Sequence, residues 1–391
     1  MRVILGFARP EFQQNRRAVS DSRIDMLARV LVRYSVGVRP GNLVSLVGPP
    51  QTEPLVIALY REVLQAGGHP LVLMTPEACT EELYRHGSAE QLSFVNPLDL
   101  QEVALVDATV HIGATLNTRA LTNIPPQKQA LRSQARKGLM DLFLRRAAEK
   151  SLRWVYTQLP CHASAQDAEM SLTDYEEFVY GAGMLNEPDP PAAWQELSER
   201  QARVVERLQG VRDLRFTTPR GTDLRVGVAG RHWINCDGHE NFPDGEVFTG
   251  PIEDATEGTV CFDFPAVHGG REVVGARLVF RAGRVVDASA HKGEEFLIGM
   301  LDQDAGARTL GEVAVGCNYA ITRYTRNTLF DEKIGGTFHV ALGAAYPESG
   351  GKNESGLHWD MVCDLRTGGR IEADGQLLSE NGRFLDETWP R

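Results

Sequence analysis

The 391-residue chain carries 41 lysines and arginines against 52 aspartates and glutamates, which gives a net charge of −11 and a pI near 5.5. This balance argues against nucleic-acid binding, because phosphate groups are bound by clustered Lys and Arg side chains. Hydrophobic residues make up 42% and charged residues 24%, which excludes a disordered or fibrous chain and allows a sizeable core. The length exceeds one ordinary core, so two domains are expected.

The sequence also lacks the marks of a membrane or secreted protein. Its longest apolar runs, such as residues 43–47 and 70–74, are far shorter than the ~20 residues that a membrane helix needs. The N-terminal string MRVILGFARPEFQQNRR has no small-residue cleavage site and does not read as a secretory signal. Six cysteines stand singly with no C-x-x-C pair, which argues against a disulfide framework and a thiolate zinc site. We therefore expect a cytoplasmic protein that binds neither membrane nor nucleic acid.

The first half of the chain alternates helical and strand patterns. Apolar residues recur at helical spacing over 22–36, and a short apolar run of the buried-strand type follows at 42–48. The alternation continues with a helix at 53–66, a buried strand at 70–74, a helix at 76–86, a strand at 108–113, a long helix at 128–150, a strand at 154–158, and helices at 167–180 and 192–208. This order predicts a parallel sheet with helical crossovers.

The pattern changes after Gly210. Helix formers become scarcer, β-branched residues become more common, and glycine-centred turns separate alternating stretches. The clearest hairpin joins residues 277–280 to 285–289, and one helix is expected near 293–302. We predict an α/β domain over residues 1–209, followed over residues 210–391 by a β-rich α+β domain that carries a metal site.

Several common catalytic signatures are missing from the chain. There is no G-x-S-x-G elbow, and no G-x-G-x-x-G follows a predicted strand. His239 and Glu240 are not followed by the second histidine of an H-E-x-x-H motif. Any metal ligands must therefore come from separate segments.

The second half supplies such segments. His358 and Asp360 stand two residues apart in a strand-like context, and the period of two sends both side chains to one face. Alone, this pair is more often a hydrogen-bonded histidine on a sheet than a metal site. His339 opens an apolar strand, where an imidazole needs a partner. Tyr346 ends that segment, where its hydroxyl could reach the same cluster, although for a tyrosine taken alone core packing is the better explanation.

Two glutamates extend this set. Glu246 and Glu312 each follow a glycine and lead an apolar run. Either could simply face solvent, since Glu is rarely buried unless it is paired. Two Glu, two His and one Asp nevertheless form a set that can hold two metal ions through imidazoles and bridging carboxylates.

Four strings between residues 241 and 361 occur in a telling order: NFPDGEVFTGP, GEVAVG, TRNTLFDEKIGGTFHVALGAAYP and NESGLHWDM. They resemble the successive signatures of the thermophilic metalloaminopeptidase family, which includes aminopeptidases T, S and II. The resemblance implies two divalent ions (zinc, cobalt or manganese), held by Glu246, Glu312, His339, His358 and Asp360. It makes Glu332 a further candidate ligand and places Tyr346 in the family's tyrosine position beside the metals.

The resemblance also implies short peptide substrates and a homodimer. One departure stands out, because only eleven residues, PESGGKNESGL, separate Tyr346 from His358, where many members carry a longer insertion. The substrate pocket or the dimer contacts near this loop therefore need not follow the family pattern.

The chemistry implied by these residues is hydrolysis of the N-terminal peptide bond. A divalent ion lowers the pKa of water from 15.7 toward ~7 and polarises the carbonyl group. We expect Glu246 or Glu312 to bridge the ions, an activated water to attack the carbonyl carbon, and Tyr346 to donate a hydrogen bond to the oxyanion. The free α-amine would bind a metal or a carboxylate. The general base stays open between Glu246, Glu312 and Glu332.

Two other functions fit the sequence. His339, His358 and Asp360 could form the two-His-one-carboxylate triad of a mononuclear non-haem iron enzyme, namely a ring-cleaving dihydroxypyridine dioxygenase of related architecture. Glu246 and Glu312 favour the peptidase, because a single iron with open positions needs no extra acidic ligands. The second alternative is a metal-free, two-lobed binding protein for small peptides or amino acids. Metal analysis separates the three functions.

Overall fold

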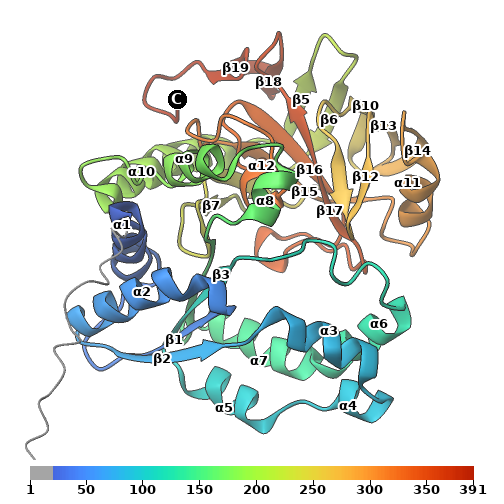
Figure 1. The fold of residues 1–391 in the computed structure, drawn as a ribbon. Helices are drawn as coiled ribbons and strands as arrows, with labels where there is room; N and C mark the ends of the chain where they lie inside the picture. Colours follow the sequence, from blue (N-terminus) through green and yellow to red (C-terminus); the bar gives the residue numbers. More distant parts are fainter. Residues whose placement is uncertain (1–20) are drawn as a thin grey trace, which may run out of the picture.

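The structure is a computed structural model that describes residues 21–391, so the string assessed as a secretory signal lies outside the described residues. Figure 1 shows the segment coloured blue to teal below the β-rich segment coloured yellow to red, with the green helices between them in sequence lying beside the upper part. Four strands of the first half and the short strand β8 of the second half form a parallel five-stranded sheet in the order β2-β1-β3-β4-β8. Its strands are β1 (Leu43–Gly48), β2 (His69–Met74), β3 (Ala108–Gly113), β4 (Arg153–Gln158) and β8 (Asn241–Phe242). The predicted α/β architecture with a parallel sheet is thus confirmed.

Helices connect these strands. They are α1 (Ser22–Val30) with a π-helical continuation at Leu31–Ser35, α2 (Glu53–Gln65) after a 3-10 turn at Pro50–Thr52, α3 (Glu77–His86), α4 (Ala89–Ser93), α5 (Pro97–Leu105), α6 (Pro126–Ala135), α7 (Lys137–Ala148), α8 (His162–Asp167), α9 (Leu172–Ala182) and α10 (Pro190–Leu208). Asp21 caps α1 by accepting a hydrogen bond from the backbone N–H of Arg23 at 2.9 Å, which satisfies one of the free donors at the helix start.

Three of the predicted elements need correction. The single helix expected over residues 128–150 is two helices, because Arg136, with φ −81° and ψ −1°, forms a turn between α6 and α7. The helix expected over 167–180 begins later, as α9 at Leu172, because Glu169 takes a positive φ of 57°, and a separate short helix, α8, ends at Asp167. The third correction concerns β2, which exists but has no buried residue. It pairs with β1 alone at the edge of the sheet, so its apolar side chains are left uncovered.

The second half is mainly antiparallel, as predicted. One sheet has the order β14-β13-β10-β6-β5-β18-β19-β20. It contains β5 (Asp213–Thr217), β6 (Asp223–Gly227), β10 (Thr256–Cys261), β13 (Arg277–Arg281), β14 (Arg284–Ser289), β18 (Arg370–Ala373), β19 (Gln376–Glu380) and β20 (Arg383–Phe384). The expected hairpin is β13 with β14, and the expected helix is α11 (Glu294–Leu301).

A second antiparallel sheet has the order β17-β16-β15-β9-β7. It contains β7 (Ile234–Cys236), β9 (Glu246–Thr249), β15 (Leu310–Gly316), β16 (Thr337–Gly343) and β17 (His358–Asp364). The short hairpin β11 (Ala266–His268) with β12 (Arg271–Val273), the helix α12 (Thr328–Asp331) and a 3-10 turn at Pro347–Ser349 complete the described elements. Every residue of β15 and β16 is buried, which places these two strands in the centre of the second half.

The helix α10 contributes to two hydrophobic cores. Trp194 and Leu197 in its first half pack with the parallel sheet, whereas Val204 and Leu208 pack with the antiparallel sheets. The proposed boundary at residue 209 falls directly after this helix and stays a prediction. The strand β8 comes from beyond that boundary and yet pairs with β4, so the two halves are tied together by the sheet itself.

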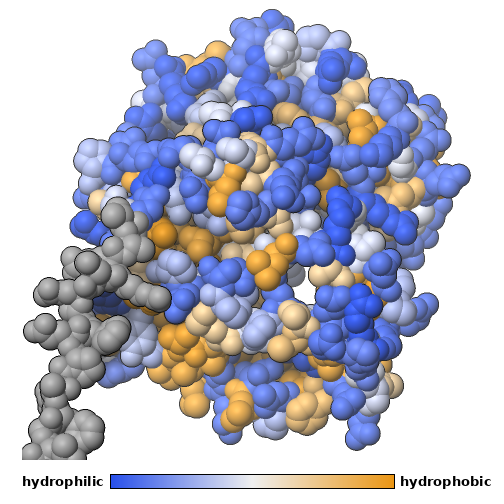
Figure 2. Space-filling model, in the orientation of Figure 1, coloured by the Kyte–Doolittle hydropathy of each residue, from blue (hydrophilic) through white to orange (hydrophobic). Residues whose placement is uncertain are grey.

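Apolar side chains gather on the lower part of the surface in Figure 2, whereas the upper part is mostly polar. Leu98 and Leu105 on α5 and Leu144 on α7 are among the exposed large hydrophobic residues. Among residues 21–391, no helix has both the length and the apolar character needed to cross a bilayer. All six cysteines are free, in agreement with the expectation of no disulfide framework.

Candidate metal centre

Four adjacent elements of the second antiparallel sheet bring the predicted ligands together. Glu246 begins β9, Glu312 lies in β15, His339 lies in β16, and His358 and Asp360 begin β17. The strand registers pair Ala314 with His339, Gly316 with Glu246, and Ala341 with Asp360. Five residues that are distant in the sequence thus meet on one sheet.

His339 is the centre of this cluster and is fully buried. Its Nε2 atom lies 3.1 Å from Glu312 Oε1, 3.6 Å from Glu246 Oε2 and 4.0 Å from Asp360 Oδ1. The two glutamates are only 5% and 4% exposed, so the interpretation of solvent-facing glutamates at strand entrances does not hold. Both glutamate side chains are buried because each faces the imidazole of His339.

His358 and Asp360 share one face of β17, as the period of two predicts. His358 Nε2 lies 3.5 Å from Asp360 Oδ1 and 3.9 Å from Glu312 Oε2. Glu312 therefore lies between the two imidazoles and links them. The pair is part of a larger cluster and is not an isolated histidine on a sheet face.

Both imidazoles are oriented by backbone carbonyl groups. The Nδ1–H of His339 donates to the carbonyl oxygen of Glu332 at 3.0 Å, and the Nδ1–H of His358 donates to that of Ala344 at 2.9 Å. These bonds leave Nε2 of each ring facing the carboxylates. Histidine ligands in metal sites are fixed in this way, with one nitrogen held by the protein and the other turned to the ion.

Burial and mutual charge shift the pKa values of this cluster. Burial raises the pKa of Glu246, Glu312 and Glu332 above their ordinary values. It acts to lower the pKa of His339 and His358, but their acidic neighbours, chiefly Glu312 and Asp360, raise both to about 10. Burial acts to raise the pKa of Asp360, and the adjacent His358 more than offsets this and lowers it. The carboxylates therefore depend on nearby positive charge to remain ionised.

Two charged residues of the cluster were missed by the sequence analysis. Lys333 is 0% exposed, and its Nζ lies 3.3 Å from Glu246 Oε1, 4.0 Å from Asp244 Oδ1 and in close contact with Glu332. Asp244 is buried beside it. The sequence signal for Lys333 was its place between two apolar residues, Phe330 and Ile334. Both are fully buried in the structure.

The donor atoms fit a divalent cation. Glu246 Oε2 and Asp360 Oδ1 are buried and have no hydrogen-bond partner among the described residues, and such atoms normally have one. Two sets of candidate ligand atoms lie within 4.8 Å of one another, namely Glu246 with Glu312 and His339, and Glu332 with His339 and Asp360. Imidazole nitrogens mixed with carboxylate oxygens suit zinc, cobalt and manganese.

Tyr346 lies at the edge of the cluster. Its ring centroid is 5.3 Å from that of His358 and 5.5 Å from that of Phe248, and the residue is 45% exposed. Burial of the phenol group raises its pKa, and the charges of Glu312 and Asp360 raise it further. The hydroxyl therefore keeps its proton at neutral pH. Core packing does not explain Tyr346, because nearly half of it is accessible.

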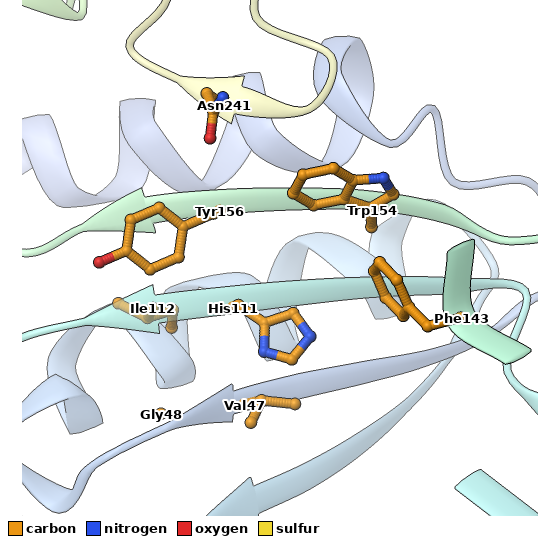
Figure 3. A pocket seen from close by; sticks show the side chains of 8 residues that line it. All are labelled: Val47, Gly48, His111, Ile112, Phe143, Trp154, Tyr156 and Asn241. Carbon is orange, nitrogen blue, oxygen red and sulfur yellow. The ribbon is translucent and has the colours of Figure 1, made fainter. Parts of the chain in front are cut away.

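A separate cavity of about 460 Å³ lies in the parallel sheet, away from these ligands. Figure 3 shows its aromatic lining, in which Trp154 and Tyr156 project from β4 and Phe143 projects from a neighbouring helix. His111 on β3 completes this side of the lining. Burial lowers the pKa of His111, so this imidazole is neutral at neutral pH, in contrast to those of the cluster.

The sequence profile of the family described as thermophilic metalloprotease (M29) matches residues 20–384. The chain belongs to this family. Aminopeptidase 2 from Geobacillus stearothermophilus is 29% identical to it over 398 residues, which span 91% of this chain and 95% of that protein. Aminopeptidase T from Thermus thermophilus is 32% identical over 299 residues, which span 68% of this chain and 71% of that protein.

Two solved structures share the fold. Wild-type AmpT from Thermus thermophilus superposes with a TM-score of 0.81 at 26% identity and covers 93% of this chain and 99% of its own. A 2,5-dihydroxypyridine dioxygenase from Pseudomonas putida KT2440 superposes with a TM-score of 0.57 at 12% identity, over 94% of this chain and 98% of its own. The second likeness is one of fold alone. The family match and the relatives named aminopeptidases confirm the predicted metalloaminopeptidase class.

Proposed function

We propose that this metalloprotease removes the N-terminal residue of short peptides at a centre that holds two divalent cations through Glu246, Glu312, His339, His358 and Asp360, with Glu332 beside them. The observation that carries the proposal is the convergence of these side chains. Two of their buried oxygens, Glu246 Oε2 and Asp360 Oδ1, have no hydrogen-bond partner among residues 21–391. Carboxylates that are buried in this way need positive charge.

The residues of the chain have distinct parts in this proposal. When bound, the ions lower the pKa of a water and polarise the scissile carbonyl group. Glu312 lies between the two imidazoles and suits a shared ligand. Tyr346, which keeps its proton, donates a hydrogen bond to the carbonyl oxygen as negative charge develops there. The buried carboxylates attract the α-ammonium or amine of a free N-terminus, which an internal peptide bond lacks. They repel negatively charged groups of a substrate.

Proton transfer to the leaving amine belongs to one of Glu246, Glu312 and Glu332. Burial raises the pKa of all three, and a general acid–base group works best with a pKa near the operating pH. The glutamine variant that keeps both ions but loses turnover identifies the residue.

Metal analysis combined with peptide hydrolysis tests the proposal. We expect about two ions per chain by mass spectrometry, and metal-stripped protein should regain hydrolysis of leucyl p-nitroanilide with zinc, cobalt or manganese added singly. N-acetyl-leucyl p-nitroanilide, which has no free amine, should remain intact. The exposed His86 on α3 provides the control, because His86→Ala should keep both ions and full activity.

The same experiment separates the alternatives. The dioxygenase shares the fold, but its chemistry would require about one iron per chain and oxygen-dependent cleavage of a dihydroxypyridine ring. A metal-free binding protein would contain no stoichiometric metal. Either result would overturn the proposed function.

We further propose that the enzyme is a cytoplasmic homodimer. The exposed leucines of α5 and α7 support a second copy as the covering partner. These two helices lie in the lower part of the molecule in Figure 1, where apolar residues gather on the surface in Figure 2. Free cysteines support a reducing compartment. Light scattering after size exclusion should give twice the mass of one chain. A monomer would contradict the dimer without touching the proposed chemistry.

A further inference from the structure

Lys333 is a fully buried ammonium group inside the metal centre, and the proposed chemistry does not use it. Its Nζ contacts Glu332 and lies 3.3 Å from Glu246 Oε1 and 4.0 Å from Asp244 Oδ1. Glu246 thus turns one oxygen to the lysine and the other toward His339. A buried lysine is rare unless its charge is paired, so this arrangement requires a reason.

The fold holds the lysine in this place. Asn327 caps α12 by accepting from the backbone N–H of Leu329 at 3.1 Å, and the backbone N–H of Lys333 then donates to Phe330. The Lys333 carbonyl group accepts from the backbone N–H of Asn318. A Cβ atom at Gly316 would lie 2.1 Å from the carbonyl oxygen of Ile334. The glycine therefore lets the segment that carries Lys333 pack directly against β15.

The charges of the cluster need this cation. Five carboxylates meet here, namely those of Asp244, Glu246, Glu312, Glu332 and Asp360. The two histidines are neutral when they act as ligands. Among residues 21–391, Lys333 is the only lysine or arginine that pairs with any of these carboxylates. One lysine and two divalent ions together balance five negative charges, which buried groups require.

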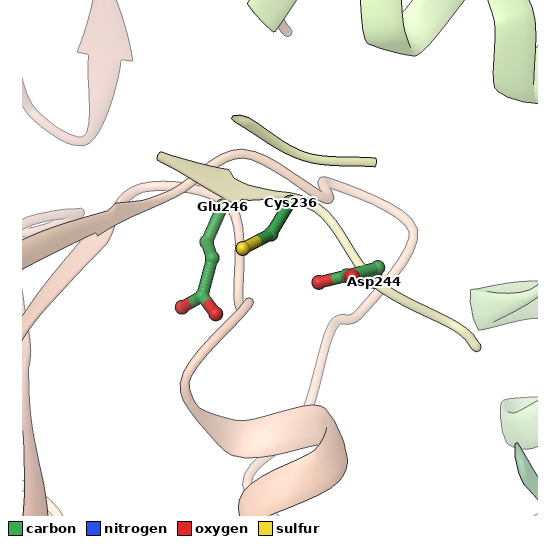
Figure 4. Close-up of side chains that lie close together, drawn as sticks. All are labelled: Cys236, Asp244 and Glu246. Atoms are coloured by element: carbon green, nitrogen blue, oxygen red, sulfur yellow. The ribbon is translucent and has the colours of Figure 1, made fainter. Parts of the chain in front are cut away.

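Lys333 also faces a further set of candidate ligand atoms, beyond the two sets around His339. Cys236, Asp244 and Glu246 offer ligand atoms within 4.8 Å of one another. Cys236 and Glu246 are opposite each other on the antiparallel strands β7 and β9, and Figure 4 shows their side chains projecting to the same side, with Asp244 turned toward them from the adjoining loop. The ammonium group of Lys333 lies beside this set and contacts two of its members, Asp244 and Glu246.

We propose that Lys333 is a built-in third cation of the centre, which positions Glu246 and Glu332 and fills the place beside Asp244, so that divalent ions are confined to the side of His339 and His358. The inference rests on the proposed function, since it assumes that two ions bind. Lys333 is a positioning residue and makes no contact with the reacting atoms. Its positive charge is part of the chain, whereas the divalent ions must be bound from solution.

Metal counting after equilibrium dialysis against manganese or zinc tests this inference. Lys333→Ala removes the ammonium and leaves room beside Asp244, so the ratio of ions to chain should rise from about two to about three. The metal-free variant should also unfold at a lower temperature than the metal-free wild type, because its carboxylates lose their permanent counter-charge.

A double variant isolates charge from packing. Asp244→Asn removes one negative charge but keeps the oxygen that accepts from the Gly245 backbone N–H at 3.0 Å. Combined with Lys333→Ala, it should return the count to about two and recover part of the lost thermal midpoint. Asp244→Asn alone should keep about two ions. If metal-free Lys333→Ala does not fold, Lys333→Met keeps the aliphatic packing, and Asp244→Asn should raise its midpoint in the same way.

Three results would overturn the inference. In the first, Lys333→Ala binds two ions and melts like the wild type. In the second, it loses ions that Asp244→Asn does not restore, which would make the lysine a packing element. In the third, Asp244→Asn fails to raise the midpoint of Lys333→Met. A wild type that does not bind two ions would instead defeat the proposed function, so the two failures are distinguishable.

Discussion

The parallel sheet and the antiparallel sheet that carries the candidate metal ligands contain similarly apolar strands, but they differ in what covers them. In β16, TFHVALG, all seven residues are buried. In β2, HPLVLM, none is buried. The histidines differ as well, because burial lowers the pKa of His111 in the parallel sheet, whereas acidic neighbours raise that of His339 to about 10.

This difference shows that an apolar run predicts a strand but does not indicate whether other elements pack over it. The candidate metal centre lies in the sheet that is filled from both sides, where charges interact strongly because water is excluded. The parallel sheet keeps an open edge and an aromatic-lined cavity. Fully buried strands thus carry Glu312 and His339, and free surface is left in the half that is proposed to meet another copy.

The largest effect expected from this comparison separates the two histidines. His339→Ala should lower metal affinity by more than ~100-fold and remove activity, since loss of even an outer partner of a metal ligand costs ~10–100-fold. His111→Ala should keep both ions, because His111 has no acidic partner in the parallel sheet. Metal content after dialysis and leucyl p-nitroanilide turnover measure both. Retention of two tightly bound ions by His339→Ala would contradict the assigned centre.

The second prediction compares the same substitution in the two sheets. Leu342 on β16 is 0% exposed, whereas Leu71 on β2 is 37% exposed. Leu342→Ala should lower the free energy of unfolding by about 2–5 kcal/mol, and Leu71→Ala by less than ~1 kcal/mol. Urea denaturation of the metal-free proteins gives both values. Equal losses would show that β2 is covered in solution, which would locate the dimer contact at this edge.

The third prediction concerns pH. The folded-state pKa values of His339 and His358 are about 10, above the ordinary value of about 6.5. A raised pKa means that the folded protein binds protons more tightly than the unfolded chain, so its stabilisation is present below pH ~6.5 and is lost as the pH rises toward 10. The raised pKa values of Glu246 and Glu312 act in the same direction at lower pH.

Metal-free protein should therefore melt at a lower temperature at pH 9 than at pH 6.5. The rise in melting temperature on adding metal should be larger at pH 9, because the ligands must lose protons to bind the ion. Differential scanning calorimetry with and without metal checks both statements, with His339→Ala as the comparison. A metal-induced rise that shrinks at higher pH would be inconsistent with these assignments.

The smallest expected effect tests the loop that leads to β17. The Nδ2 group of Asn353 donates to the carbonyl oxygens of Gly306 at 3.0 Å, Thr309 at 3.2 Å and Gly343 at 2.5 Å. Asn353→Ala should cost about 1–3 kcal/mol, since it removes a donor that three carbonyl groups share. The exposed neighbour Glu354 is the control, and Glu354→Ala should change stability by less than ~0.5 kcal/mol. Similar losses in the two variants would mean that the asparagine does not anchor the short loop.

Much of the site followed from local sequence. The H-x-D spacing placed His358 and Asp360 on one face, and the family strings supplied Glu246, Glu312 and His339. The burial of the two glutamates did not follow, because it depends on strands β9 and β15 meeting β16. Lys333 and Asp244 were missed for the same reason. The burial of a charged residue can be recognised only when its partners are known, and here those partners come from other strands.

The fold was predictable where periodicity was strong and failed where a single residue decided the path. The alternation of strands and helices gave the parallel sheet. The break at Arg136 was not visible, because a single turn residue divides α6 from α7. The open edge at β2 was not visible either, since strand order depends on tertiary contacts.

The strand β8 has a consequence for how such enzymes can be recombined. It spans only Asn241–Phe242, yet it extends the sheet of the other half by pairing with β4, and Glu246 follows it closely along the chain. A chimera that joins the halves of two relatives near residue 210 would match one parent's edge strand with the other parent's sheet and would displace the first glutamate of the centre. Residues 241–246 should therefore be inherited together with the sheet that receives them.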